Sequence, residues 1–123
     1  MRKEILIIED DEKIQKLITL TLGDFKNKKN IFSNGLMACK YIEENNKKIG
    51  LIFLDIGLEG INGFEVLKKI RQELNLKIPV IVTSAYVSKE DIKKGVTLRA
   101  NYYLTKPFNL RQLIEVCKEY LGE

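Results

Sequence analysis

The 123-residue sequence has no histidine, no tryptophan, and only two cysteines and two prolines. Without histidine a Ser-His or Cys-His catalytic triad is impossible, and a zinc site is disfavoured because histidine and cysteine are its usual ligands. Cys39 and Cys117 fall in segments that read as different helices, without the spacing of metal ligands. We therefore expect both to remain free thiols, buried or half-buried.

Long apolar runs are also missing, since none approaches the roughly 20 residues that a membrane-spanning helix needs. The chain enters an apolar segment directly after Met1-Arg2-Lys3, without a signal-peptide pattern. We therefore expect a cytoplasmic protein with no membrane segment. The net charge of +4 comes from scattered lysine pairs without interleaved aromatic residues, so direct nucleic-acid binding is not expected.

Apolar runs alternate with segments of helical periodicity five times, which is typical of βαβ units with right-handed crossovers. Strands are expected at residues 4–8, 30–33, 51–55, 80–84 and 102–105. Asp11, Ser88 and Asn109 are expected to cap the first, fourth and fifth helices. The third helix is expected over 64 to about 74. The pattern predicts one α/β domain over residues 1–123, with five helices around a parallel sheet.

Asp55 directly follows an apolar run that suits a central strand covered on both faces. A carboxylate is costly there unless something compensates its charge. In open α/β sheets, however, ligands bind just beyond the carboxyl ends of the strands. Asp55 is therefore the first candidate for chemistry, and a loop aspartate that caps a turn is the alternative.

Other polar residues follow the remaining strands: Glu9-Asp10, Thr83-Ser84 and Lys106-Pro107. In a doubly wound sheet these strand ends lie on one edge. Carboxylates that close repel each other unless a cation intervenes, and hard oxygen ligands with open water positions suit Mg²⁺. A carboxylate can also accept a phosphoryl group, whose oxygens a lysine, a hydroxyl and a divalent ion could share. The strand ends together predict a phosphoryl-accepting site.

In this order and spacing the chain resembles the receiver domain of two-component response regulators, over essentially its whole length. The marks are the acidic pair, Leu54-Asp55, Gly63-Phe64-Glu65, Pro79, Ser84-Ala85 and Tyr103-Leu104-Thr105-Lys106-Pro107-Phe108. The resemblance implies a doubly wound, flavodoxin-like fold with strand order 2-1-3-4-5. Two helices would cover one face of the sheet and three the other.

The resemblance also implies a role for each matching residue. Asp55 would be the phospho-acceptor, Lys106 would contact the phosphate, and Ser84 and Tyr103 would form the switch. Mg²⁺ would be bound by Glu9, Asp10, Asp55 and the backbone carbonyl of Gly57. Lys106-Pro107 would be a cis peptide. Two alternatives stay open at this point, because Asp11 extends the acidic run and Thr83 is a rival for the switch hydroxyl.

The resemblance implies partners as well. Because the chain has no histidine, a separate histidine kinase or histidine phosphotransfer protein must donate the phosphoryl group. Docking candidates are Ile14, Gln15, Leu17, Pro107 and Phe108, and partial exposure of Ile14 would favour docking over core packing. The output is expected in a downstream protein target or in an output domain outside this chain. The domain would signal, and assist its own phosphorylation and dephosphorylation, without being an enzyme in the usual sense.

Several positions depart from the family's usual pattern. Arg99 stands where glycine is common, and a positive φ there would strain it. Asn101, Tyr102 and Val116 replace the charged residues with which regulators carrying winged-helix outputs form a dimer. We therefore expect a monomer in the unphosphorylated state. The family tunes phosphoryl lifetime at positions held here by Gly57 and Tyr86.

Three other functions were weighed. A flavin-binding module of the same fold should offer an anion-binding loop after the first strand, where this chain has Glu9-Asp10-Asp11-Glu12. A Mg²⁺-dependent phosphohydrolase commonly has a second aspartate two residues after the nucleophile, where Gly57 stands. A degenerate receiver that docks without phosphate is disfavoured by the complete set of acidic residues, hydroxyl and lysine.

Overall fold

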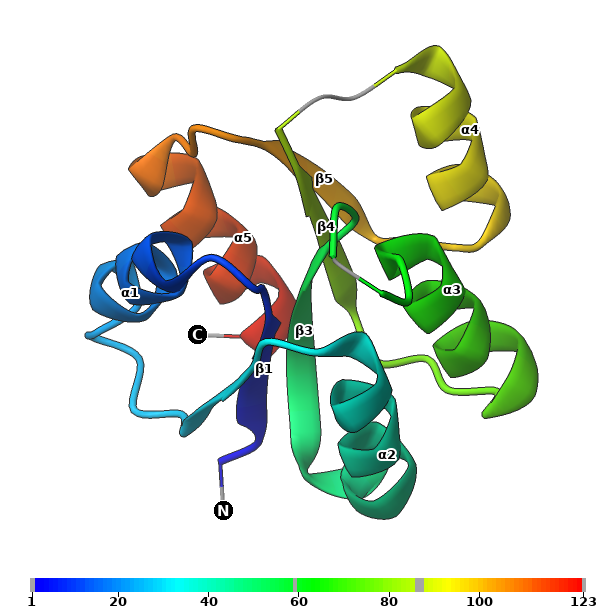
Figure 1. Cartoon of the computed structure of the whole chain (residues 1–123). Coiled ribbons are helices and arrows are strands. Elements are labelled where there is room, and N and C mark those ends of the chain that lie inside the picture. The colour runs from blue at the N-terminus through cyan, green and yellow to red at the C-terminus, as the bar shows by residue number, and fades with distance from the viewer. Residues whose placement is uncertain (1, 59, 86–87, 123) are drawn as a thin grey trace.

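The computed structural model describes residues 2–58, 60–85 and 88–122. Five strands form one parallel sheet in the order β2-β1-β3-β4-β5 (Figure 1). The strands are β1 (Glu4–Ile8), β2 (Lys29–Phe32), β3 (Ile49–Asp55), β4 (Val80–Ser84) and β5 (Tyr102–Thr105). The helices are α1 (Glu12–Thr21), α2 (Gly35–Asn45), α3 (Gly63–Lys68), α4 (Lys89–Thr97) and α5 (Leu110–Leu121).

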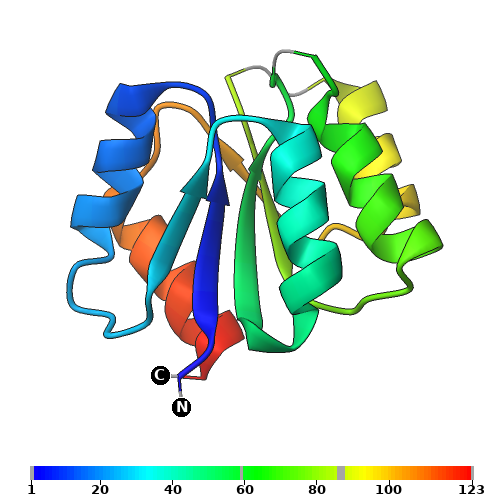
Figure 2. The ribbon, with the colours of Figure 1, turned by 60° about the horizontal axis from the view of Figure 1, so that its bottom comes forward.

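The alternation of side chains along the strands divides the core between the two faces of the sheet. Ile5, Ile7 and Phe53 point to the face that is covered by α1 and α5. Leu6 and Leu54 point to the opposite face, which α2 and α3 cover. Figures 1 and 2 show α4 on that second face, so two helices cover one side and three the other. The predicted fold is confirmed.

Helix starts follow the predicted capping chemistry. The side chain of Asp11 accepts a hydrogen bond from Lys13 N, and that of Asn109 accepts one from Gln112 N. Ser88 and Asp91 form a reciprocal capping box at the start of α4. Each side chain satisfies a backbone N–H that has no partner within its own helix. These local signals are readable from sequence because both partners lie within four residues.

The structure differs from the expectation in three boundaries. β2 begins at Lys29 and ends before Ser33, and β3 begins at Ile49 rather than at Leu51. The third helix leaves α-helical geometry after Lys68 and continues as a π-helical segment, Lys69–Glu73. There Leu74 N donates to the Lys69 carbonyl five residues earlier. Periodicity alone did not reveal this segment because its apolar side chains still follow one helix face.

The two cysteines are buried free thiols on opposite faces of the sheet, as predicted. Cys39 belongs to the core under α2, and Cys117 to the core under α5. Burial raises the pKa of each thiol, to about 12 for Cys117. Within the described ranges, no helix combines the length and apolar character that crossing a membrane requires.

Candidate functional site

The ends of β1 and β3 bring two carboxylates together under the loops at one edge of the sheet. Leu54 pairs with Ile8, so Asp55 and Glu9 stand side by side just past this pair. Asp55 is 5% exposed and Glu9 is 2% exposed. Two carboxylates this deeply buried require a positive partner.

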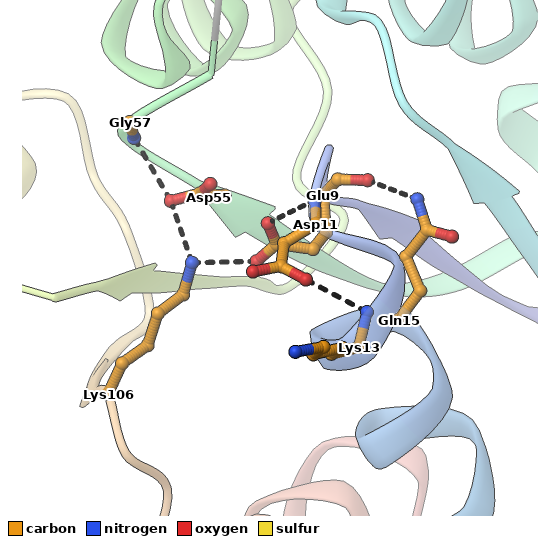
Figure 3. A network of polar contacts seen from close by, with 7 residues as sticks. All are labelled: Glu9, Asp11, Lys13, Gln15, Asp55, Gly57 and Lys106. Atoms are coloured by element: carbon orange, nitrogen blue, oxygen red, sulfur yellow. Dashed lines mark hydrogen bonds and ion pairs between the residues drawn. The ribbon is translucent and has the colours of Figure 1, made fainter.

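Lys106 supplies that partner from the loop after β5. Its Nζ lies 2.7 Å from Oε1 of Glu9 and 3.3 Å from Oδ1 of Asp55 (Figure 3). The Lys106 backbone N–H donates to the Ser84 carbonyl at 2.8 Å, which ties the loop to the end of β4. The Lys106-Pro107 peptide is cis, as the resemblance implied. The lysine is thus placed between the two buried carboxylates.

The electrostatics of the site show a shortage of positive charge. Burial raises the pKa of Glu9 from 4.5 to about 7, and the Asp55 carboxylate raises it too, against the opposing effects of Lys106 and the Asp11 N–H. Burial alone lowers the pKa of Lys106, but Glu9 and Asp55 raise it overall. One lysine therefore does not fully compensate the two carboxylates, and a further cation would be stabilised here.

Glu9, Asp10 and Asp55 can each place one carboxylate oxygen so that all three lie within 4.8 Å of one another. Asp10 is exposed, so this oxygen-only set is open to water on one side. Such a set fits Mg²⁺, which keeps several water ligands. Asp11 is directed elsewhere: its Oδ1 accepts from Lys13 N at 2.8 Å. The register left open by the sequence is thereby decided in favour of Glu9 and Asp10.

The loop after Asp55 approaches the site through glycines. Gly57 N donates to Oδ1 of Asp55 at 3.0 Å, whereas the metal contact expected for its carbonyl stays a prediction. A Cβ on Gly63 would lie 2.5 Å from the Asp55 carbonyl and 2.6 Å from the Ile56 Cα. Only glycine lets α3 begin this close to the strand end. Gly63 is therefore needed to position the loop that carries Gly57.

Gln15 has a role that the sequence did not reveal. Its side-chain N–H donates to the Glu9 carbonyl at 2.6 Å and to Ser33 Oγ at 3.3 Å. Figure 3 shows this side chain reaching from α1 to the end of β1. The expectation that Gln15 docks a donor gives way to this positioning role. Its spacing within α1, one turn after the acidic run, was the only available signal.

Ser84 and Tyr103 are the expected switch residues. Ser84 follows Val82 on the face covered by α2, α3 and α4, and Tyr103 pairs with Val82 in the adjacent strand and packs against the same core. Thr83 lies on the other face of the strand and pairs with Asp55. The alternation therefore favours Ser84 over Thr83 as the hydroxyl that can work with Tyr103. Tyr86 lies outside the described residues.

Comparison with known proteins identifies the family. The model of the response regulator receiver domain matches residues 5–118. The chain belongs to this family. Receiver domains are signalling modules of two-component systems. NisR, the nisin biosynthesis regulatory protein of Lactococcus lactis subsp. lactis, is 34% identical over 111 residues, covering 90% of this chain and 47% of that protein. The chain thus spans about half the length of this relative.

Solved structures agree with the family. The CheY-like receiver domain protein from Methanospirillum hungatei superposes with a TM-score of 0.89 and 30% identity, covering 99% of this chain and 95% of that one. The Mn²⁺-bound form of response regulator Rcp1 superposes with a TM-score of 0.85 and 28% identity, covering 97% and 94%. The divalent ion in that title belongs to Rcp1, and it agrees with the oxygen-rich cluster found in this receiver domain.

Proposed function

We propose that this receiver domain accepts a phosphoryl group on Asp55 from the phosphohistidine of a histidine kinase or of a histidine phosphotransfer protein. The observation that carries the proposal is the placement of the Lys106 ammonium between the buried Asp55 and Glu9 carboxylates. A buried nucleophilic carboxylate beside a cation and an open acidic cluster suits phosphoryl transfer, in which positioning and electrostatics supply most of the rate.

The chain's own residues assign parts of the step. Oδ1 of Asp55 already contacts the Gly57 N–H and the Lys106 ammonium, so Oδ2 is the oxygen that attacks phosphorus. The new O–P bond forms on Asp55 as the N–P bond to the donor imidazole breaks, and the imidazole leaves with its electron pair. Lys106 then pairs with the phosphoryl oxygens, because these carry more charge than the carboxylate it contacted before.

Glu9, Asp10 and Asp55 would hold Mg²⁺, with the Gly57 carbonyl as a further ligand. When bound, the ion would neutralise charge on the phosphoryl oxygens. The raised pKa of Glu9 supports this assignment, because the buried carboxylate pair has more negative charge than Lys106 compensates. The exposed side of Asp10 leaves room for water ligands.

An apolar groove beside the site is suited to donor docking. It has a volume of about 400 Å³ and is lined by Ile14, Leu17, Ala85, Lys106, Pro107 and Phe108. Ile14 is partly exposed and Leu17 is 37% exposed, so neither is consumed by the core. A donor helix that lays apolar side chains in this groove would bring its phosphohistidine to Asp55.

Phosphorylation would be read through Ser84 and Tyr103. Ser84 would move to donate to a phosphoryl oxygen, and Tyr103 would turn into the space it leaves. The surface formed by α4, β5 and α5 would change with them, and a downstream protein or an output domain outside this chain would bind one of the two states.

Intact mass after incubation with Mg²⁺ and acetyl phosphate tests the proposal. One added phosphoryl group is expected, and none in Asp55→Asn, which keeps the shape of the side chain but loses the nucleophile. Asp11→Asn is the matched control, because this carboxylate belongs to the same acidic run but caps α1. Labelling of Asp55→Asn, or loss of labelling in Asp11→Asn alone, would place the chemistry elsewhere. Turnover of acetyl phosphate by Asp55→Asn would point to a phosphohydrolase.

A further inference from the structure

Gly95 occupies an unexpected place for a glycine, the interior of helix α4. Glycine is the poorest helix former after proline, so a glycine in a helix calls for a compensating reason. Gly95 is also the one buried residue of α4, whose other positions are half-exposed or exposed. The contact that buries Gly95 therefore attaches the helix to the domain.

That contact is made by the ring of Tyr103 on the neighbouring strand β5. A Cβ at Gly95 would lie 2.6 Å from Cζ of Tyr103, and closer still to its Oη and Cε2. No side chain larger than hydrogen can share this position with the ring. Tyr103 thus lies directly on the backbone of α4.

A hydrogen bond fixes the ring in this position. Oη of Tyr103 donates to the backbone carbonyl of Asp91 at 2.6 Å. Asp91 and Gly95 are four residues apart, so they lie one above the other on the same face of α4. The bare backbone of Gly95 accommodates the ring, and the Asp91 carbonyl receives its hydroxyl.

We propose that Gly95 and the Asp91 carbonyl form a notch that holds Tyr103 against α4 in the unphosphorylated protein. Gly95 is thus a positioning residue that sets how readily the aromatic ring leaves its resting place. The inference rests on the proposed role of Tyr103 as the switch aromatic. Before the ring turns inward it must give up the bond to Asp91, and this bond weights the resting state by about fivefold.

The notch gives α4 its own part in signalling. While Tyr103 occupies the notch, α4 is held to β5 through its sole buried position. When the ring leaves, Gly95 loses the contact that buried it, and the helix becomes free to shift. A partner that binds only one arrangement of α4 would thereby sense the position of a ring on β5.

Fluorine NMR of the unphosphorylated protein labelled with 3-fluorotyrosine tests the notch. Tyr103→Phe identifies the Tyr103 signal by its loss. In Gly95→Ala the added methyl group should displace the ring and move this signal from its resting position. Val96→Ala is the control, because Val96 is the adjacent residue on α4 and is 69% exposed. An unmoved Tyr103 signal in Gly95→Ala would overturn the proposal.

A stability cycle gives a second, independent measurement. Alanine should raise the melting temperature at position 95 when Tyr103→Leu has removed the ring, because alanine is the better helix former. With Tyr103 present the same substitution should raise it less or lower it. Equal effects in both backgrounds would show that Gly95 has no special relation to the ring.

Both measurements use unphosphorylated protein, so they separate this inference from the proposed function. If Asp55 fails to accept a phosphoryl group while the ring moves in Gly95→Ala, the notch stands and the phosphorylation proposal falls. If Asp55 is labelled normally and the ring does not move, the notch falls alone.

Discussion

Lys106 and Glu9 form the shortest ion pair of the site, with 2.7 Å between Nζ and Oε1, although Glu9 belongs to β1 and Lys106 follows β5. The same ammonium also lies 3.3 Å from Asp55. A single lysine therefore compensates two buried carboxylates from different strands. A divalent ion or a phosphoryl group would each redistribute these contacts, which makes the pair the most sensitive reporter of the site.

The first prediction concerns pH. Because burial raises the pKa of Glu9 from 4.5 to about 7, the metal-free folded protein binds this proton more tightly than the unfolded chain. The contribution of Glu9 to stability should therefore be fully present below pH 4.5 and be lost as the pH rises to about 7. Its slope is at most about 1.4 kcal/mol per pH unit. Urea denaturation at pH 5, 6 and 7 measures it.

Glu9→Gln is the control for this titration, since it keeps the side-chain shape but cannot ionise. Its stability should lack the Glu9 component of the slope. Mg²⁺ binding needs the charged carboxylate, so in the parent protein the Mg²⁺ affinity should rise up to about tenfold per pH unit below 7. Identical pH profiles for the parent and Glu9→Gln would show that Glu9 does not titrate in this range.

The second prediction concerns Lys106. Lys106→Met removes the cation but keeps most of the side chain's length, so phosphorylation of Asp55 by acetyl phosphate should slow by about 100-fold. The fold should persist, because the backbone bond from Lys106 N to the Ser84 carbonyl remains. Lys13→Met, which removes an exposed lysine of α1, is the matched control. Equal labelling rates in the two variants would contradict a role for the ammonium.

The third prediction concerns Arg99, whose φ of 62° lies in the left-handed region. A non-glycine residue there is strained by about 1–2 kcal/mol, so Arg99→Gly should stabilise the fold. The gain should be about 1 kcal/mol, because the variant also loses the bond from Nη2 of Arg99 to the Arg71 carbonyl. Asn75, with φ 53°, is the control, since asparagine tolerates this region and Asn75→Gly should gain less. Equal urea midpoints for the two variants would refute the strain.

The fourth prediction concerns Arg71, a 5% exposed cation whose guanidinium donates to the carbonyls of Arg99 and Leu76 and to Oδ1 of Asn101. In the part of the chain that the structure describes, it forms no ion pair with a carboxylate. Burial and the charge of Arg99 lower its pKa. Arg71→Met should destabilise the protein by about 3 kcal/mol, because several buried acceptors lose their donor at once.

Asn101→Asp tests the same cluster in the opposite direction. The oxygen that accepts from Arg71 at 2.9 Å and from Val80 N at 2.8 Å would become charged. Stability at pH 7 should rise by about 1 kcal/mol, and this gain should vanish as the pH falls through the lowered pKa of the new carboxylate. The gain should be absent in an Arg71→Met background. A gain that persists there would not come from Arg71.

The sequence by itself determined the elements and their chemistry. Asp11, Ser88 and Asn109 cap helices as predicted, and β1, β4 and β5 have the expected bounds, because caps and side-chain alternation depend on near neighbours. The order of polar residues after the strands was enough to predict the acidic cluster at one edge of the sheet. Arg99 could be named in advance as a position of strain, because positive φ excludes most side chains.

The tertiary structure alone decided which of these residues meet, and how. The sequence left Glu9, Asp10 and Asp11 in one run, and the choice among them came from where the chain turns after β1. Gln15 looked like a surface residue, yet it holds the Glu9 carbonyl. Gly95 and Arg71 gave no sequence signal at all. Their roles depend on a ring and on carbonyls contributed by other elements of the fold, and such contacts exist only once the sheet and helices have assembled.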